Sequence, residues 1–123
     1  MEQDTIQYKV SDSVLANVAK IAALGVDGVR GLHTRIVDTL VEGVSGRLGK
    51  KTLRSIIVKS TDTSVTVEMY LIAELGKNLP TIAKNVQEAV KEGIENMMGT
   101  MDCTINVTIA NVVPPEEKEE END

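Results

Sequence analysis

The sequence predicts an α+β fold of two layers, in which two main helices pack on one face of a mixed β-sheet. Three stretches of the chain predict it. Apolar and polar residues alternate from Ser64 to Leu75 and again from Cys103 to Ile109, which is the two-residue period of a half-buried strand. Between them, from Leu79 to Met97, apolar residues recur with the periodicity of an amphipathic helix. Together these stretches most simply form a right-handed β-α-β unit with parallel strands.

The long helix has recognisable signals at both ends. Asn78 is a good N-cap, and Pro80 suits the first turn, where its missing N–H removes no helical hydrogen bond. Gly99 is expected to end the helix. The apolar stripe that should face the sheet consists of Leu79, Ile82, Ala83, Val86, Val90, Ile94 and Met97.

An earlier helix is expected to begin after Ser11, a favourable N-cap, and to end at Gly25. Its buried stripe is expected to consist of Val14, Leu15, Val18, Ile21 and Ala22. The outer face then carries three alanines, which are Ala16, Ala19 and Ala23. A helix that is apolar all round is buried on two sides or contacts a partner, so this face is a candidate interaction surface.

Shorter elements complete the predicted sheet. Thr5 to Val10 reads as a short edge strand, and Val26 to His33 as a strand that Gly28 and Gly31 interrupt. Ser55 to Lys59 forms another predicted strand, which a polar turn at residues 61–63 joins to the strand beginning at Ser64.

The segment before that strand combines a predicted helix with a basic loop. Thr34 is expected to cap a short helix with an apolar side of Ile36, Val37, Leu40, Val41 and Val44. An exposed loop should follow, with the cations Arg47, Lys50, Lys51 and Arg54. These cations allow three interpretations: a solvated loop, a contact for anionic lipid or an acidic partner, and a phosphate or nucleic-acid site.

The length of 123 residues fits one domain, which we place at residues 1–113. Pro114 and Pro115 should end the last strand, and residues 114–123 are expected to form a disordered acidic tail. The formal net charge is −6, and the tail supplies −5 because six acidic residues there oppose only Lys118. The rest of the chain, at −1, is nearly neutral.

The composition also limits where in the cell the protein can lie and which partners it can bind. The chain has no Phe or Trp and two Tyr, which argues against nucleic-acid recognition by aromatic stacking. It has no apolar run of about 18 residues, and its N-terminus is acidic, so neither a membrane span nor a secretory signal is expected. We predict a cytoplasmic protein, with peripheral association at the inner face of the membrane as a further hypothesis.

The residues predict no catalytic site, cofactor or metal. His33 and Cys103 are the only histidine and cysteine, so they cannot supply a cluster of metal ligands. Cys103 is in phase with Ile105 and is expected to be a small buried apolar residue. Glu68 and Glu74 are about 20 Å apart along their strand, too far for a carboxylate pair. We therefore expect a protein that is not an enzyme.

The segments ELGKNLPTIAKNVQEAVKEGIENMMG and MDCTINVTIANVV resemble the signature of the bacterial alkaline shock protein family. VSDSVLANVAKIAALGVDGVRGL is similar to the family's first helix and the strand that follows it. The similarity covers most of residues 8–113. The motif positions with an expected structural role are Gly76, Asn78, Pro80, Asn85, Gln87 and Gly99.

The resemblance implies a non-enzymatic domain that self-associates and, in some members, lies near the membrane through a membrane-anchored partner with a similar domain. We expect an oligomerising scaffold or adaptor in the cell-envelope stress response. The alternative is a regulatory subunit that docks on a cytosolic metabolic enzyme, such as one of fatty-acid metabolism. A third hypothesis is phosphate or nucleic-acid binding through the basic segment, which the neutral body makes the weakest.

Overall fold

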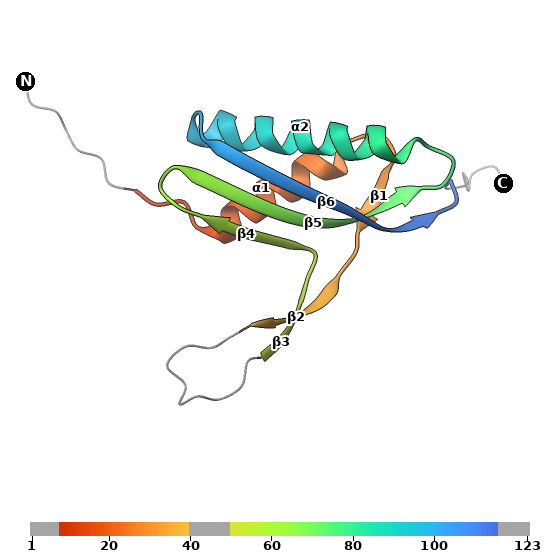
Figure 1. The fold of residues 1–123 in the computed structure, drawn as a ribbon, viewed down its shortest axis with the longest axis horizontal. Helices are drawn as coiled ribbons and strands as arrows, with labels where there is room; N and C mark the ends of the chain where they lie inside the picture. The colour runs from red at the N-terminus through yellow and green to blue at the C-terminus, as the bar shows by residue number, and fades with distance from the viewer. Residues whose placement is uncertain (1–7, 40–49, 116–123) are drawn as a thin grey trace, which may run out of the picture.

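A computed structural model describes residues 8–39 and 50–115. This described part begins with a helix, continues through five strands, and ends with a long helix and a sixth strand (Figure 1). The elements in order are α1 (Asp12–Leu24), β1 (Val29–Leu32), β2 (Arg35–Thr39), β3 (Lys50–Arg54), β4 (Ile56–Ser60), β5 (Ser64–Glu74), α2 (Leu79–Met98) and β6 (Asp102–Val113).

The main sheet is built around β5. One edge of β5 pairs with β4 and then with β1, both antiparallel, and the other edge pairs with β6 in parallel. Along the β5–β6 ladder Val65 lies beside Cys103 and Leu71 beside Ile109, and the register then shifts so that Ile72 lies beside Asn111. The sheet is therefore mixed, and the parallel pairing predicted for the two alternating stretches is confirmed.

Both helices lie on the same face of this sheet, as predicted, and the core fills the space between the layers (Figure 1). The inward-facing residues of β5 and the central residues of the α2 stripe are all buried: Val65, Val67, Met69, Leu71, Ala73, Ile82, Val86, Val90 and Ile94. Two predicted core positions are wrong, because Leu75 is 55% exposed and Met97 50% exposed. Leu75 follows the end of β5, and in the last turn of α2 the neighbouring Met98, not Met97, packs against the core.

The buried side of α1 differs from the predicted stripe. Leu15, Ala19 and Ala23 are buried, whereas Val14 is 43% exposed and Ile21 is 66% exposed. The alanines are inside because α1 packs closely against its neighbours. On the side that faces α2, a Cβ added at Gly93 would lie only 3.4 Å from Val18 Cγ1. Small residues permit this approach, so Ala19 and Ala23 belong to the core and the predicted partner surface is wrong at these two positions, while Ala16 is half-buried.

The predicted helix caps are confirmed. The side chain of Ser11 accepts a hydrogen bond from the Val14 N–H at 3.3 Å, and Asn78 Oδ1 accepts one from the Thr81 N–H at 2.9 Å. Each bond satisfies a donor that has no partner within the helix. The two caps therefore fix where α1 and α2 begin.

The segment from Arg35 to Arg54 departs most from expectation. The predicted short helix is wrong, because residues 35–39 form β2, and the predicted basic loop is wrong where residues 50–54 form β3. The two strands pair antiparallel as a ribbon, with Ile36 beside Leu53. A short apolar run fits a strand as well as a helix, and pairing with the distant β3 decides between them. Leu40, Val41, Val44 and Arg47 lie outside the described residues.

The ribbon leaves the main sheet beside one residue of β5 (Figure 1). The Tyr70 carbonyl accepts a hydrogen bond from the His33 N–H at 2.7 Å, and the Tyr70 N–H donates to the Ser55 carbonyl at 3.1 Å. Tyr70 thus holds both strands of the ribbon where they depart.

The predicted edge strand near the N-terminus is wrong for residues 8–10, which form no strand. Residues 5–7 lie outside the described part of the chain.

Candidate interaction surfaces

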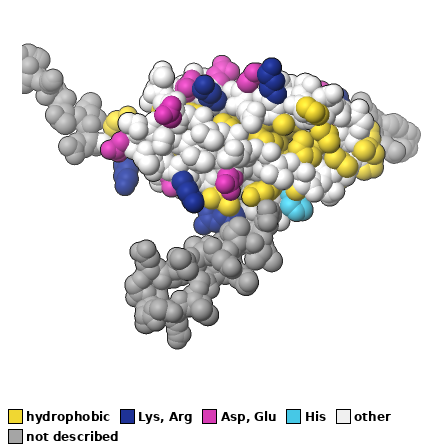
Figure 2. Space-filling model, in the orientation of Figure 1, with side chains coloured by type: hydrophobic (Ala, Val, Ile, Leu, Met, Phe, Trp, Pro, Cys, Tyr) yellow, Lys and Arg dark blue, Asp and Glu magenta, His cyan; other side chains and the backbone are white. Residues whose placement is uncertain are grey.

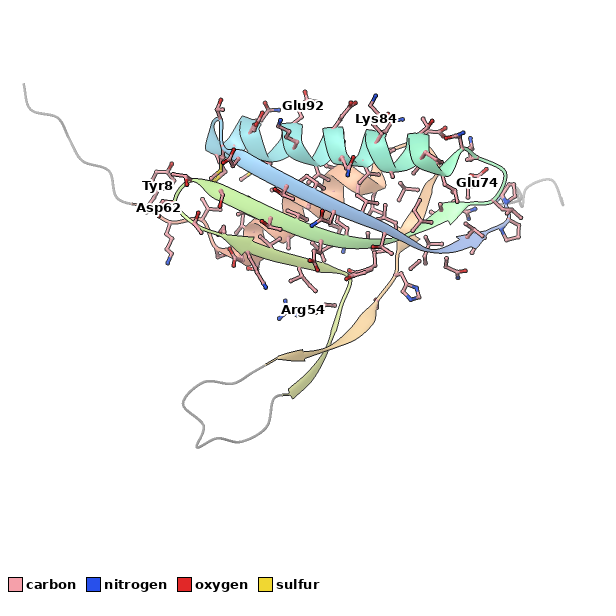
Figure 3. All side chains as sticks on the ribbon, in the orientation of Figure 1. Tyr8, Arg54, Asp62, Glu74, Lys84 and Glu92 are labelled. Atoms are coloured by element: carbon pink, nitrogen blue, oxygen red, sulfur yellow. The ribbon has the colours of Figure 1, made fainter. Side chains whose placement is uncertain are left out.

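Three of the four cations of the basic segment lie in the described part of the chain, along the ribbon and at its base. Lys50 and Lys51 belong to β3, and Arg54 ends that strand with an exposed side chain (Figure 3). Arg54 also lines an open groove of about 650 Å³ between α1 and β4, to which α1 contributes Lys20. Two cations therefore border this groove, and the pairing places Lys50 and Lys51 further out along the ribbon.

Five of the six motif residues of the central unit have a visible role at its turns and edges. Gly76 has a backbone φ of +96° after β5, and Gly99 one of +91° at the C-terminal end of α2. Asn78 caps α2 and Pro80 lies in its first turn. Gln87 reaches across to β6, and Asn85 is exposed. These contacts belong to the fold, and none of them brings a reactive group toward another.

The bond from Gln87 is a feature that sequence reasoning missed. Gln87 Nε2 donates to the backbone carbonyl of Ile105 at 2.9 Å, so a side chain of α2 satisfies a carbonyl of β6. The bond lies at the edge of β6 that faces away from β5. The sequence does mark this strand, because its eleven residues from Cys103 to Val113 include no charged residue and no proline. Such a run is unusual for a strand at the edge of a sheet, where charges and proline commonly prevent unwanted pairing.

His33 and Cys103 do not form a joint site. His33 bonds to the strand at Tyr70, whereas Cys103 lies beside Val65 at the other end of β5, about 17 Å away along the strand. Within residues 8–39 and 50–115, no three His, Cys, Asp or Glu side chains are arranged to hold a metal ion. Among the described residues, every buried polar side-chain atom has a hydrogen-bond partner. No such atom is therefore left unpaired to bind a ligand.

Cys103 is half-buried beside α2, and this setting holds its thiol in the neutral form. Burial, and next the negative charge of Glu95, raise the pKa of the thiol above its ordinary value, while Lys91 acts in the opposite direction. The thiolate is the reactive form of cysteine. The arrangement therefore lowers the reactivity of the Cys103 thiol at neutral pH.

We expect iodoacetamide to alkylate Cys103 more slowly in the folded protein than in the urea-unfolded chain at pH 7.5, because the raised pKa leaves less thiolate. The rate should rise as the pH passes above the ordinary thiol pKa. Glu95→Gln should move this profile to lower pH and Lys91→Gln to higher pH. Rates by mass spectrometry across pH 7–10 provide the measurement, and a profile that neither substitution moves would contradict the assignment.

Apolar side chains also reach solvent in two places. On α1, Val14 and Ile21 are joined by Leu24, which is 43% exposed, and the three lie on one side of the helix. The other face of the sheet, turned to the viewer in Figure 2, shows hydrophobic side chains gathered toward the end where β5 and β6 terminate. Charged side chains concentrate along α2, where Lys84 and Glu92 point away from the sheet (Figure 3).

Neither described helix could span a bilayer: α2 has the length but carries too many charged residues, and α1 is too short.

Solved structures similar to this chain include variants of the MamM CTD. One of them covers 80% of this chain and 93% of its own, at 17% identity and a TM-score of 0.45. Among curated proteins, the chain is 29% identical over 105 residues to the uncharacterized protein Spy1614 of Streptococcus pyogenes, covering 85% of each chain.

Two further relatives extend the comparison. The chain is 28% identical to the uncharacterized protein YqhY of Bacillus subtilis, covering 86% of this chain and 76% of that one. It is 26% identical to a stress response regulator gls24 homolog of Streptococcus pyogenes, covering 94% of this chain and 63% of that one. A model of the alkaline shock protein 23 family, described by its "cell envelope-related function", matches residues 1–114, and the chain therefore belongs to this family.

Proposed function

We propose that this protein is a non-enzymatic scaffold of the envelope stress response, which self-associates and holds partner proteins close to the membrane. The family supplies the cell-envelope setting. The observation that carries the proposal is the reversed face of α1, where the helix buries Ala19 and Ala23 and presents Val14, Ile21 and Leu24 to solvent. A helix that exposes its larger aliphatic residues has a surface suited to a protein contact.

The energetics favour a contact at this stripe, which we define as Val14, Ile21 and Leu24. Full burial of an aliphatic side chain is worth about 1.5–3 kcal/mol, so covering the exposed parts of three such side chains would contribute a few kcal/mol. Lys20 is exposed beside the stripe and would supply part of a polar rim, whereas Asn17 is exposed within the stripe. A central apolar patch with a polar rim is the common anatomy of a protein interface.

Light scattering coupled to size-exclusion chromatography tests self-association. We expect a mass of at least two chains at micromolar concentration, and a strict monomer would contradict the scaffold proposal. For the stripe, Ile21→Lys should reduce the proteins co-purified from envelope extracts at least tenfold, because it places a charge at the centre of the contact. Asn96→Lys, the same new residue at an exposed position of α2, is the matched control and should leave them unchanged.

The same co-purification separates the scaffold from the alternative. A scaffold should retain envelope proteins, whereas a regulatory subunit should retain one cytosolic enzyme in fixed stoichiometry. If a single metabolic enzyme dominates the wild-type sample and is lost with Ile21→Lys, the stripe is a docking site on that enzyme and the scaffold proposal fails.

We further propose that the four cations Arg47, Lys50, Lys51 and Arg54 favour contact with anionic membrane surfaces. Each cation near such a surface contributes about 1 kcal/mol, so changing Arg47, Lys50, Lys51 and Arg54 together to Gln should lower binding to phosphatidylglycerol vesicles by two or more orders of magnitude at low salt. Deleting residues 116–123, which removes five negative charges net, should raise it. Vesicle co-sedimentation at 20 and 300 mM salt provides the measurement, and equal binding of all three proteins would exclude this contact.

A further inference from the structure

We propose that the free edge of β6 is where two copies of this chain pair, through antiparallel addition of one β6 to the other. This inference rests on the proposed self-association and specifies the surface and register that produce it. It assigns the contact to backbone groups of one strand, centred on Thr108, rather than to the exposed stripe of α1.

The length and composition of β6 make its edge suitable. β6 has twelve residues, whereas β4 has five and β1 four. Within the described part of the chain β6 pairs only with β5, so its other edge carries no strand. Edge strands usually avoid pairing by being short, or by carrying Lys or Pro. β6 is long and has neither, and its only charged residue is Asp102 at its start.

Two hydrogen bonds at β6 establish which of its backbone groups point away from β5. The Asp102 N–H donates to the Thr63 carbonyl, so this residue points toward β5. The Ile105 carbonyl instead accepts from Gln87 on α2, so Ile105 points away from β5. Because successive residues of a strand point to opposite sides, the outward groups before the register shift are those of Cys103, Ile105, Val107 and Ile109.

Gln87 then selects the register. Its amide occupies the outward carbonyl of Ile105, and this leaves Val107 and Ile109 as the adjacent pair of residues with open groups. A two-fold axis at Thr108 places Val107 of each copy opposite Ile109 of the other, and both residues then exchange N–H···O=C bonds across the interface. Thr108 faces Thr108 of the second copy in a close pair without backbone bonds, a favourable cross-strand combination.

The occupant is a second copy because the edge is complementary to itself. Residues 103–113 carry no charge, so self-pairing brings no like charges together between the two paired strands. The antiparallel arrangement separates the two Asp102 residues to opposite ends, about 40 Å apart. One symmetric contact also covers both free edges at once, whereas a bound peptide would cover one.

Engineered disulfides test the register. In a Cys103→Ser background, Thr108→Cys should form a covalent dimer on mild oxidation, because the Cα atoms of such a close pair are about 4.5 Å apart and within disulfide range. Thr104→Cys is the matched control: the residue is also an exposed threonine on the same face of β6, but its two copies would be about 27 Å apart. We expect at least a tenfold difference in cross-linked fraction.

Comparable cross-linking of both variants, or stronger cross-linking at position 104, would overturn the proposed pairing. Light scattering of the wild-type chain separates this failure from that of the proposed function. A wild-type dimer whose Thr108→Cys variant does not cross-link means that the chain self-associates through another surface. A wild-type monomer would overturn both proposals.

Val107→Pro gives a second, independent test. It removes an outward N–H and leaves the β5–β6 ladder intact, since proline is tolerated where the N–H of an edge strand faces solvent. The dissociation constant of the dimer should rise at least tenfold while the circular dichroism spectrum stays native. A native variant with unchanged affinity would overturn the edge as the dimer contact. If Val107→Pro does not fold, the comparison of Thr108→Cys with Thr104→Cys remains the test of the proposed pairing.

Discussion

Val90→Asp is expected to abolish cooperative folding at 25 °C. Val90 is fully buried on α2, against the inner face of the sheet. The substitution removes an aliphatic side chain from the core and places a carboxylate where no cation is available, at a cost of about 5 kcal/mol or more. Because small domains are stable by about 5–15 kcal/mol, this change alone removes most or all of the margin.

The measurement is thermal unfolding followed by circular dichroism at 222 nm. Asn85→Asp introduces the same residue at an exposed position of α2 and should change the free energy of unfolding by less than about 1 kcal/mol. If Val90→Asp melts cooperatively within about 1 kcal/mol of the wild type, α2 does not pack on the sheet as described.

Gly28→Ala should destabilise the protein by about 2–5 kcal/mol. Gly28 precedes β1 with a backbone φ of +97°, which costs a residue with a Cβ about 1–2 kcal/mol. The added Cβ would also lie 2.6 Å from Cδ1 of Ile82, a buried residue of α2, and one of them must move. Crowding of this kind adds about 1–3 kcal/mol.

Gly31→Ala provides the comparison for that result. Gly31 lies only three residues further along, in β1, but a Cβ there meets no atom within 4 Å and its φ is not positive. Urea unfolding should show Gly31→Ala within about 1 kcal/mol of the wild type. Equal effects of both substitutions would mean that the contact with Ile82 is not what requires glycine at position 28.

The central β-α-β stretch could be predicted because local and long-range preferences agree there. Alternation on β5 and β6, the stripe of α2 and the cap at Asn78 all specify the same arrangement. α1 was harder, because Ala19 is as compatible with a surface as with a core. Only the close approach of α1 to its neighbours, visible where Gly93 meets Val18, reveals which face is inside.

The interaction surfaces were less predictable than the fold. The spacing of apolar residues around Ile36 fits a short helix as well as a strand. The strand that pairs with Ile36, β3, begins fourteen residues further along the sequence, so no local signal distinguishes a helix from a strand here. The exposure of Ile21 follows from the rotation of α1, which depends on tertiary packing. The open edge of β6 depends on strand order, which a single sequence does not specify.

The attachment of the ribbon at Tyr70 has a consequence for modularity. His33 and Ser55 are both held opposite the same residue of β5, so the chain enters and leaves the excursion at nearly one point. For an insertion closed at its base, the entropic cost of loop closure grows only slowly with the length of the insertion. Residues 34–54 can therefore be exchanged for a short turn, or for a binding segment grafted from another protein, without rebuilding the domain that carries them.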